Sequence, residues 1–250
     1  MSTKLDPTSA STRKQTLDSV LSGIPTTNAP VFVETQPEQF GFRPLTYREL
    51  RRRFWHMSPG LLAFALHVVS HADPMTPTLR WIIVGFSVAI GLKIFLDFRK
   101  IQRKGEGTGT AAVAGYSFSV LLTILLFPRH LEIGLAVLSI LAFGDGSATL
   151  FGLMFRGRRL PWNTAKSWTG LLSFFAVGTF MTAWIYCGET RNPEAADPSV
   201  SFFTSVGLVA PAVIAAGLAE SLKSRINDNV RVGAVAAVVM ATVHFLFRPF

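Results

Sequence analysis

The chain has 250 residues, of which 49% are hydrophobic and only 16% are charged, and it carries a formal net charge of +9. A soluble domain usually has about 25% charged residues. The single cysteine, Cys187, excludes an internal disulfide and a cysteine-based zinc cluster. Because the basic residues gather at the ends of apolar runs, they indicate membrane topology and anionic lipid contact, and they exclude a nucleic-acid partner.

Residues 1–45 are rich in Ser, Thr, Pro and Gln and show no sustained apolar period. This composition predicts a disordered tail. The tail has no apolar stretch followed by a small-residue cleavage site, so we expect no secretory signal. Residues 46–250 are expected to form one transmembrane domain.

The rest of the chain alternates long apolar blocks with short polar loops, a pattern typical of a polytopic helical membrane protein. We therefore predict an all-α fold, a transmembrane helical bundle with about seven spans. A span needs roughly 20 apolar residues. The expected spans are 58–72, 79–98, 110–127, 131–154, 168–187, 201–222 and 230–247.

The positive charges are distributed unequally between the two sets of alternate loops. One set holds about fifteen Lys and Arg residues and the other about four, a bias that places the richer loops in the cytosol. The tail then lies in the cytosol, as do the loops and span ends that carry the polar motifs. The host membrane is a bacterial inner membrane or an organelle membrane.

Asp145 lies inside an apolar run, between Gly144 and Gly146. A carboxylate in a membrane span costs about 2.5–3.5 kcal/mol on insertion scales and usually faces a bundle interior or a watery cavity. Asp145 is thus a candidate Mg²⁺ ligand, since Mg²⁺ prefers carboxylate oxygens and phosphates. The structural alternative is a buried polar group that pairs two helices.

The loop that follows holds Lys166 and Ser167, which are suited to neutralising and hydrogen-bonding phosphate. Gly144, Gly146 and Gly152 remove side chains where a helix opens or a phosphate approaches the backbone.

A second acidic patch, with Glu220 and Asp228, lies at the next cytosolic turn. With Asp145 these acids are candidates for binding metal and for deprotonating an alcohol. The structural alternative is a helix cap at Asn227 or Asp228. His56, at the cytosolic entry of the first span, is either structural, a phosphate contact or a base.

Several of these segments resemble the CTP-dependent polyprenol kinase family, which includes phytol kinase, dolichol kinase and yeast-type diacylglycerol kinase. The phytol kinase branch is the most similar. The resemblance covers about residues 48–235. The segments that carry it are Arg53-x-x-His56, Glu106-Gly107, Asp145-Gly146-x-Ala148, Gly152, Leu160-Pro161-Trp162-Asn163, Lys166-Ser167-x-x-Gly170, Glu220-Ser221-Leu222 and Asp228-Asn229.

The resemblance implies a multi-pass enzyme that uses CTP and a divalent cation such as Mg²⁺ to phosphorylate a lipid alcohol. It places Asp145, Lys166, Glu220 and Asp228 in the catalytic set, with Asp145 and Asp228 as metal ligands. Thr169 stands where the dolichol branch has an acidic residue, which argues against a dolichol-type enzyme. The expected nucleotide-binding residues are Arg53, His56, Gly144, Gly146, Gly152, Lys166, Ser167, Gly170 and Asn229.

Two alternatives remain open at this point. One is a CTP:phosphatidate cytidylyltransferase, which shares motif features with the family and makes CDP-diacylglycerol. The other is a non-catalytic transporter or scaffold, although the paired broken helices of transporters are not visible. Phytol, polyprenols and diacylglycerol all fit the sequence as substrates, since an apolar groove discriminates poorly between lipid chains. The sequence is also compatible with any oligomeric state.

Overall fold

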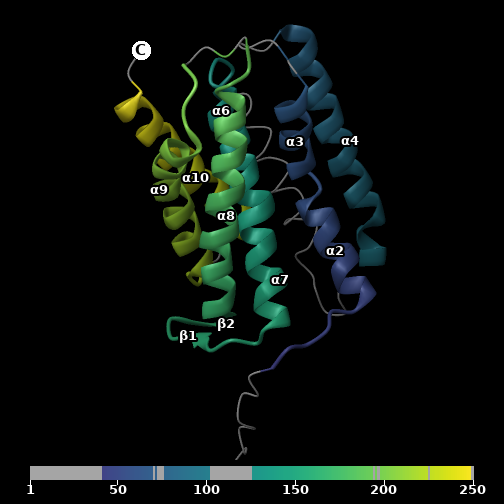
Figure 1. The fold of residues 1–250 in the computed structure, drawn as a ribbon. Helices are drawn as coiled ribbons and strands as arrows, with labels where there is room; N and C mark the ends of the chain where they lie inside the picture. Colours follow the sequence, from purple (N-terminus) through teal and green to yellow (C-terminus); the bar gives the residue numbers. More distant parts are fainter. Residues whose placement is uncertain are drawn as a thin grey trace, which may run out of the picture. The chain divides into compact units, whose positions relative to one another are not determined.

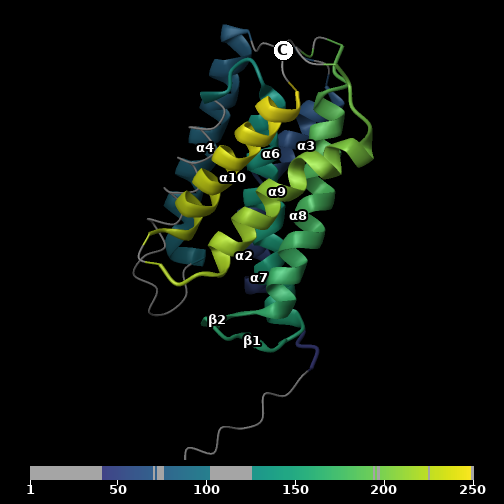
Figure 2. The ribbon, with the colours of Figure 1, turned by 90° about the vertical axis from the view of Figure 1, so that its left-hand side faces the viewer.

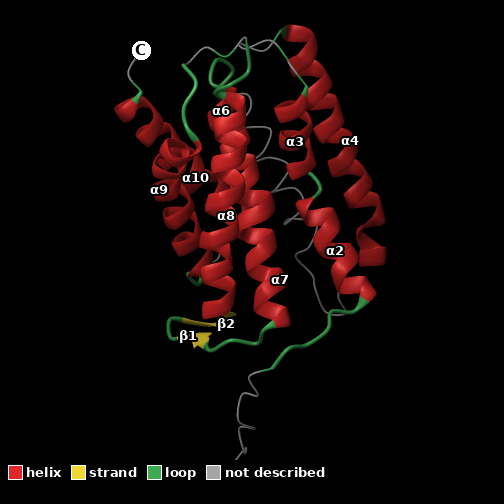
Figure 3. Ribbon diagram, in the orientation of Figure 1, coloured by secondary structure: helices red, strands yellow, loops and turns green. Residues whose placement is uncertain are grey.

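The computed structural model describes residues 41–69, 71, 76–101, 126–193, 195, 198–224 and 226–248, all within the unit Glu38–Phe250. These residues form helices and one small hairpin (Figure 1; Figure 3). In chain order the elements are α2 (Tyr47–Met57), α3 (Gly60–Val68), α4 (Pro77–Ile101), α6 (Leu131–Ser139), the π-helical turn η1 (Ile140–Asp145), α7 (Gly146–Met154), β1 (Arg159–Leu160), β2 (Asn163–Ser167), α8 (Trp168–Glu189), α9 (Phe202–Ser221) and α10 (Asp228–Phe247).

Four helical segments of the described chain are long and apolar enough to cross a membrane, which supports an integral membrane protein. They match four of the expected spans to within two residues at each end. They are Leu131–Met154, Trp168–Glu189, Phe202–Ser221 and Asp228–Phe247.

The expected count of about seven spans is not confirmed. The span predicted at 58–72 corresponds to α3, whose nine residues cover only about 14 Å of a hydrocarbon layer about 30 Å thick. The span predicted at 79–98 lies within α4, which is not among the four. The span predicted at 110–127 and the tail predicted at 1–45 fall almost wholly outside the described residues. The orientation inferred from loop charge stays a prediction.

The continuous run α6–η1–α7 forms the centre of the bundle, and α8, α9 and α10 pack beside it (Figure 2). Every residue from Leu131 to Gly144 is buried, as expected of a helix that is apolar on all sides. The outward faces of the neighbouring helices expose Phe203, Leu218 and Val238. Such apolar outer surfaces suit contact with lipid tails.

Two local features depart from a regular all-helical bundle. The central run widens into a π-helical turn over Ile140–Asp145, a rare feature that often occurs at functional sites. The predicted 155–167 loop folds in part as an antiparallel hairpin, in which Arg159 pairs with Ser167 and Leu160 with Asn163. The hairpin lies at the end of the bundle where α7 ends and α8 begins (Figure 1), and it is a small addition to the helical fold that was expected.

Candidate active site

Asp145 is the last residue of the π-helical turn, and its side chain is 13% exposed. One of its oxygens, Oδ2, lies 2.9 Å from Nε2 of His56 on α2. Arg53, one turn earlier on α2, is close enough for its charge to act on Asp145. The predicted segment Arg53-x-x-His56 therefore meets the predicted metal ligand, although the two are 89 residues apart in the chain.

Lys166, at the end of β2, is the cation around which the acidic residues gather. Its Nζ donates a hydrogen bond to Oε1 of Glu220, at the end of α9. The same Nζ lies 3.7 Å from Oδ2 of Asp228, the first residue of α10. Glu220 is only 4% exposed, whereas Asp228 is 48% exposed. The end of β2 and the α9–α10 turn, which are more than 50 residues apart in the chain, thus supply one charged cluster.

The electrostatics of the cluster keep Lys166 positively charged. Burial lowers the pKa of the Lys166 amine, but the negative charges of Glu220, Asp145 and Asp228 outweigh burial and hold this pKa above its ordinary value. The negative charge of Asp145 therefore stabilises the same ammonium group that Glu220 and Asp228 contact. A cation fixed between carboxylates is suited to holding phosphate oxygens.

The hairpin is anchored to the end of α9 by two side chains of the Trp162-Asn163 motif. Asn163 Nδ2 donates to the carbonyl of Ser221 at 2.9 Å, and Trp162 Nε1 donates to Ser221 Oγ at 3.1 Å. Because Ser221 follows Glu220 directly, these bonds place Lys166 opposite its acidic partner. Neither Trp162 nor Asn163 was expected to take part in the site, and the only signal for them in the sequence is their place in the Leu160-Pro161-Trp162-Asn163 motif.

Ser167 and the predicted nucleotide-binding glycines also have structural roles. Ser167 is the N-cap of α8, and its Oγ accepts from the Gly170 N–H at 3.2 Å. A Cβ built on Gly170 would lie 2.8 Å from the Ala148 carbonyl oxygen, and one on Gly152 would lie 3.1 Å from Ser167 Oγ. The absence of these side chains lets α7 and α8 approach closely.

The other two glycines likewise have close neighbours. A Cβ on Gly144 would lie 3.0 Å from the Phe174 ring, and one on Gly146 would meet Met57 of α2. Helix packing thus explains all four positions, and their contact with a nucleotide stays a prediction.

The start of α10 holds both a helix cap and an acid that faces the site, the two roles considered for the second acidic patch. Asn227 caps the helix by accepting from the N–H of Asn229 at 3.0 Å, as the structural alternative expected. Asp228 instead turns toward cations, since Oδ1 accepts from Arg231 Nη2 at 2.9 Å and Oδ2 faces Lys166. Arg231 thus neighbours the site, whereas its sequence context indicated only a charge in a cytosolic loop.

Comparison with known proteins finds plant phytol kinases. The chain is 26% identical to the chloroplastic phytol kinase 1 of Arabidopsis thaliana over 219 residues, covering 81% of this chain and 69% of that protein. It is 33% identical to a probable chloroplastic phytol kinase of Zea mays over 97 residues, 37% of this chain and 32% of the maize protein. A probable phytol kinase 2 of Glycine max is 37% identical over 68 residues, 27% of this chain and 23% of the soybean protein.

No protein-family model and no solved structure matches the chain. The matches to the maize and soybean proteins span less than a third of the length of either. The similarity over most of the chain is modest, but it points to the same branch as the motifs around Asp145 and Lys166. The curated homologues of this chain are phytol kinases, and its resemblance to the phytol kinase branch of the CTP-dependent polyprenol kinase family is confirmed.

Proposed function

We propose that this protein transfers the γ-phosphoryl group of CTP to the hydroxyl group of a membrane lipid alcohol, with phytol as the first candidate. The proposal rests on the Lys166 cluster. In this cluster the Lys166 amine contacts Glu220 and Asp228, and the negative charge of Asp145 also acts on it. Homology to phytol kinases supports a lipid-alcohol substrate, and the four apolar helices support a membrane setting.

In the proposed reaction, a bond forms between the lipid hydroxyl oxygen and the γ-phosphorus. The bond from that phosphorus to the bridging oxygen breaks, and CDP leaves. Phosphoryl transfer of this kind depends mainly on positioning and on charge stabilisation. We assign Lys166 to the phosphate oxygens and Asp228 to the hydroxyl proton, since Asp228 is exposed whereas Glu220 is buried against Lys166.

The site's oxygen donors fit Mg²⁺, which binds through one or two carboxylates and completes its coordination with phosphates and water. Asp145 would hold the ion, and His56 at 2.9 Å would orient this carboxylate. Asp228, the second expected ligand, is already paired with Lys166 and Arg231, so we assign the ion to Asp145. When bound, Mg²⁺ supplies positive charge that offsets the charge of the phosphates.

The test is product analysis with purified protein, with phytol or phosphatidate as the lipid and with CTP or ATP labelled at the γ-phosphate. Labelled lipid phosphate together with CDP supports the proposal, whereas pyrophosphate and a CDP-lipid from phosphatidate would establish the cytidylyltransferase alternative. Equal use of ATP would refute CTP specificity. Absence of any nucleotide binding would favour a transporter or scaffold.

The variant that tests the site is Asp145→Asn. We expect its activity to fall by about 100-fold or more, the loss typical when a group that stabilises transition-state charge is removed. Glu189→Gln is the matched control, because Glu189 is also a buried acid but ends α8 away from Lys166 and pairs with His71 at 2.9 Å. Full kinase activity in folded Asp145→Asn protein would overturn the assignment.

A further inference from the structure

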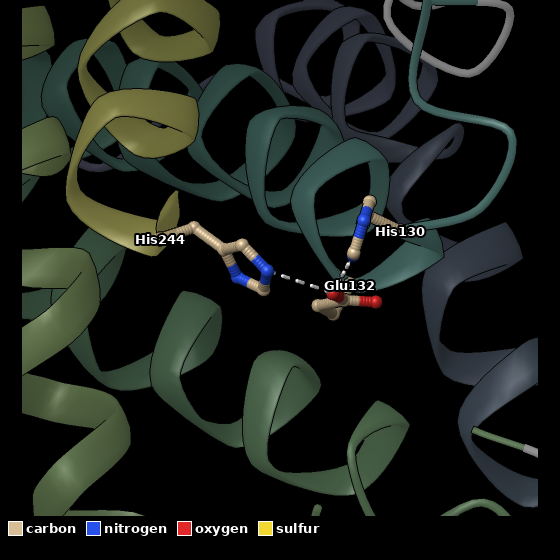
Figure 4. Close-up of side chains that lie close together, drawn as sticks. All are labelled: His130, Glu132 and His244. Atoms are coloured by element: carbon tan, nitrogen blue, oxygen red, sulfur yellow. Dashed lines mark hydrogen bonds and ion pairs between the residues drawn. The ribbon is translucent and has the colours of Figure 1, made fainter. Parts of the chain in front are cut away.

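A second cluster of ionisable groups joins α6 to α10 at the end of the bundle opposite the hairpin (Figure 1; Figure 4). It consists of His130, Glu132 and His244, and their nearest ligand atoms all lie within 4.8 Å of one another. His130 precedes α6, Glu132 lies in the first turn of α6, and His244 lies in the last turn of α10. Asp228 begins α10, so the cluster is separated from the Lys166 site by nearly the whole helix.

The three groups point toward one another, as Figure 4 shows. His130 Nδ1 lies 3.1 Å from Glu132 Oε1, and His244 Nε2 lies 3.4 Å from the same oxygen. Two ligands of a tetrahedral zinc ion with bonds of about 2.0–2.1 Å lie about 3.3–3.4 Å apart. Both separations are therefore close to those between two ligands of one small ion.

Two of the three donors are buried, and one of them is held by a further hydrogen bond. His244 is 0% exposed and Glu132 is 3% exposed. The other ring nitrogen of His244, Nδ1, lies 2.9 Å from the hydroxyl of Tyr186 on α8, to which Arg248 Nη1 donates at 3.5 Å. A hydrogen bond at the second ring nitrogen fixes a ligand histidine's tautomer and orientation, and outer partners of this kind are typical of metal sites.

We propose that His130, Glu132 and His244 bind a divalent transition-metal ion of the Zn²⁺ class, which ties the start of α6 to the end of α10. Two imidazoles and one carboxylate are the donors that Zn²⁺ accepts, whereas Mg²⁺ prefers oxygen donors alone. An ion would also compensate the buried charge of Glu132, which is otherwise costly to bury. This site is separate from the proposed kinase site, and its role is structural.

The experiment uses the full chain, purified in detergent with a tag that contains no histidine, stripped with a chelator and titrated with Co²⁺ and then with Zn²⁺. Co²⁺ is the spectroscopic probe, because a tetrahedral Co²⁺ site with nitrogen ligands absorbs strongly in the visible range. We expect saturation at an equimolar amount of Co²⁺, displacement by Zn²⁺, and insensitivity to excess Mg²⁺. Absence of a tetrahedral Co²⁺ spectrum in the wild-type chain would overturn the proposal without any variant.

Variants test which residues bind. His244→Gln and Glu132→Gln should abolish the Co²⁺ spectrum, and Tyr186→Phe should keep it with an affinity about 10–100-fold lower, as expected for loss of an outer partner. His71→Gln is the matched control, because His71 forms a separate buried pair with Glu189. Asp145→Asn should also leave the spectrum unchanged. A spectrum that survives His244→Gln, or disappears in His71→Gln or Asp145→Asn, would show that the ion binds elsewhere.

Discussion

Replacement of Lys166 by glutamine gives the most informative test of the charged cluster. The change removes the cation that bonds to Glu220 and lies 3.7 Å from Asp228. Glu220 is 4% exposed, so its carboxylate would remain buried without a positive partner. Breaking a buried ion pair in this way costs about 3–5 kcal/mol. Because the Lys166 side chain is 28% exposed and water screens part of the interaction, we expect the lower end, about 3 kcal/mol.

The assay is equilibrium unfolding in mixed micelles, followed by helical circular dichroism, for a double-mutant cycle. The cycle compares Lys166→Gln, Glu220→Gln and the double variant, which removes both charges. The loss in the double variant should be smaller than the sum of the two single losses by about 2 kcal/mol, which is the coupling between contacting groups. Lys223→Gln is the control, because Lys223 is exposed just beyond α9. Its effect should stay within about 0.5 kcal/mol.

Kinase activity separates the structural role of Lys166 from its proposed phosphate contact. Lys166→Gln should lower kcat by about 10²–10³-fold, and the double variant should regain stability without regaining activity. Additive losses of stability in the cycle would refute the buried pair. Wild-type turnover in Lys166→Gln protein would refute the phosphate contact.

Three further predictions concern pH, capping and packing. Because the pKa of Lys166 is raised on folding, the stability that this amine contributes should be complete below about pH 10.5 and should disappear as pH rises through the folded-state pKa. Alkaline titration should therefore reduce the difference in unfolding free energy between wild type and Lys166→Gln. Ser167→Ala removes the α8 N-cap and should cost about 1 kcal/mol, with Ser167→Asp restoring most of it, as measured by thermal unfolding. Gly170→Ala would place a Cβ 2.8 Å from the Ala148 carbonyl oxygen and should lower the melting temperature. Gly207→Ala is the control and should not lower it, because a Cβ there meets nothing within 4 Å. Equal effects of the two variants would contradict the close approach of α7 and α8.

The sequence predicted the elements that follow from composition. Four spans agree with the structure because a segment that enters a bilayer must be continuously apolar over about 20 residues, a property visible in one dimension. The gathering of Asp145, Lys166, Glu220 and Asp228 at one end of the bundle was also predictable. Antiparallel spans bring alternate loops to the same side, and the polar motifs all occupied loops or span ends of one set.

Individual contacts were not predictable in this way. Nothing in the spacing of His56 and Asp145 indicates that they lie 2.9 Å apart. The π-helical turn that ends at Asp145 has no local sequence signal, and neither does the anchoring of Asn163 on the Ser221 carbonyl. The glycines that suggested phosphate contact lie where helices cross closely, a property of the partner helix and not of the glycine itself.

The order of residues along the chain was enough to locate four helices that are long and apolar enough to cross a membrane, and to group the polar residues that lie at one end. These properties depend on hydrophobicity and charge, which act residue by residue along the chain. The contacts of Lys166 with Glu220 and Asp228, and the cluster of His130, Glu132 and His244 at the other end, became visible in the folded chain alone. Such side-chain contacts depend on the rotation and register of helices against one another, which are set by packing between segments far apart in the sequence.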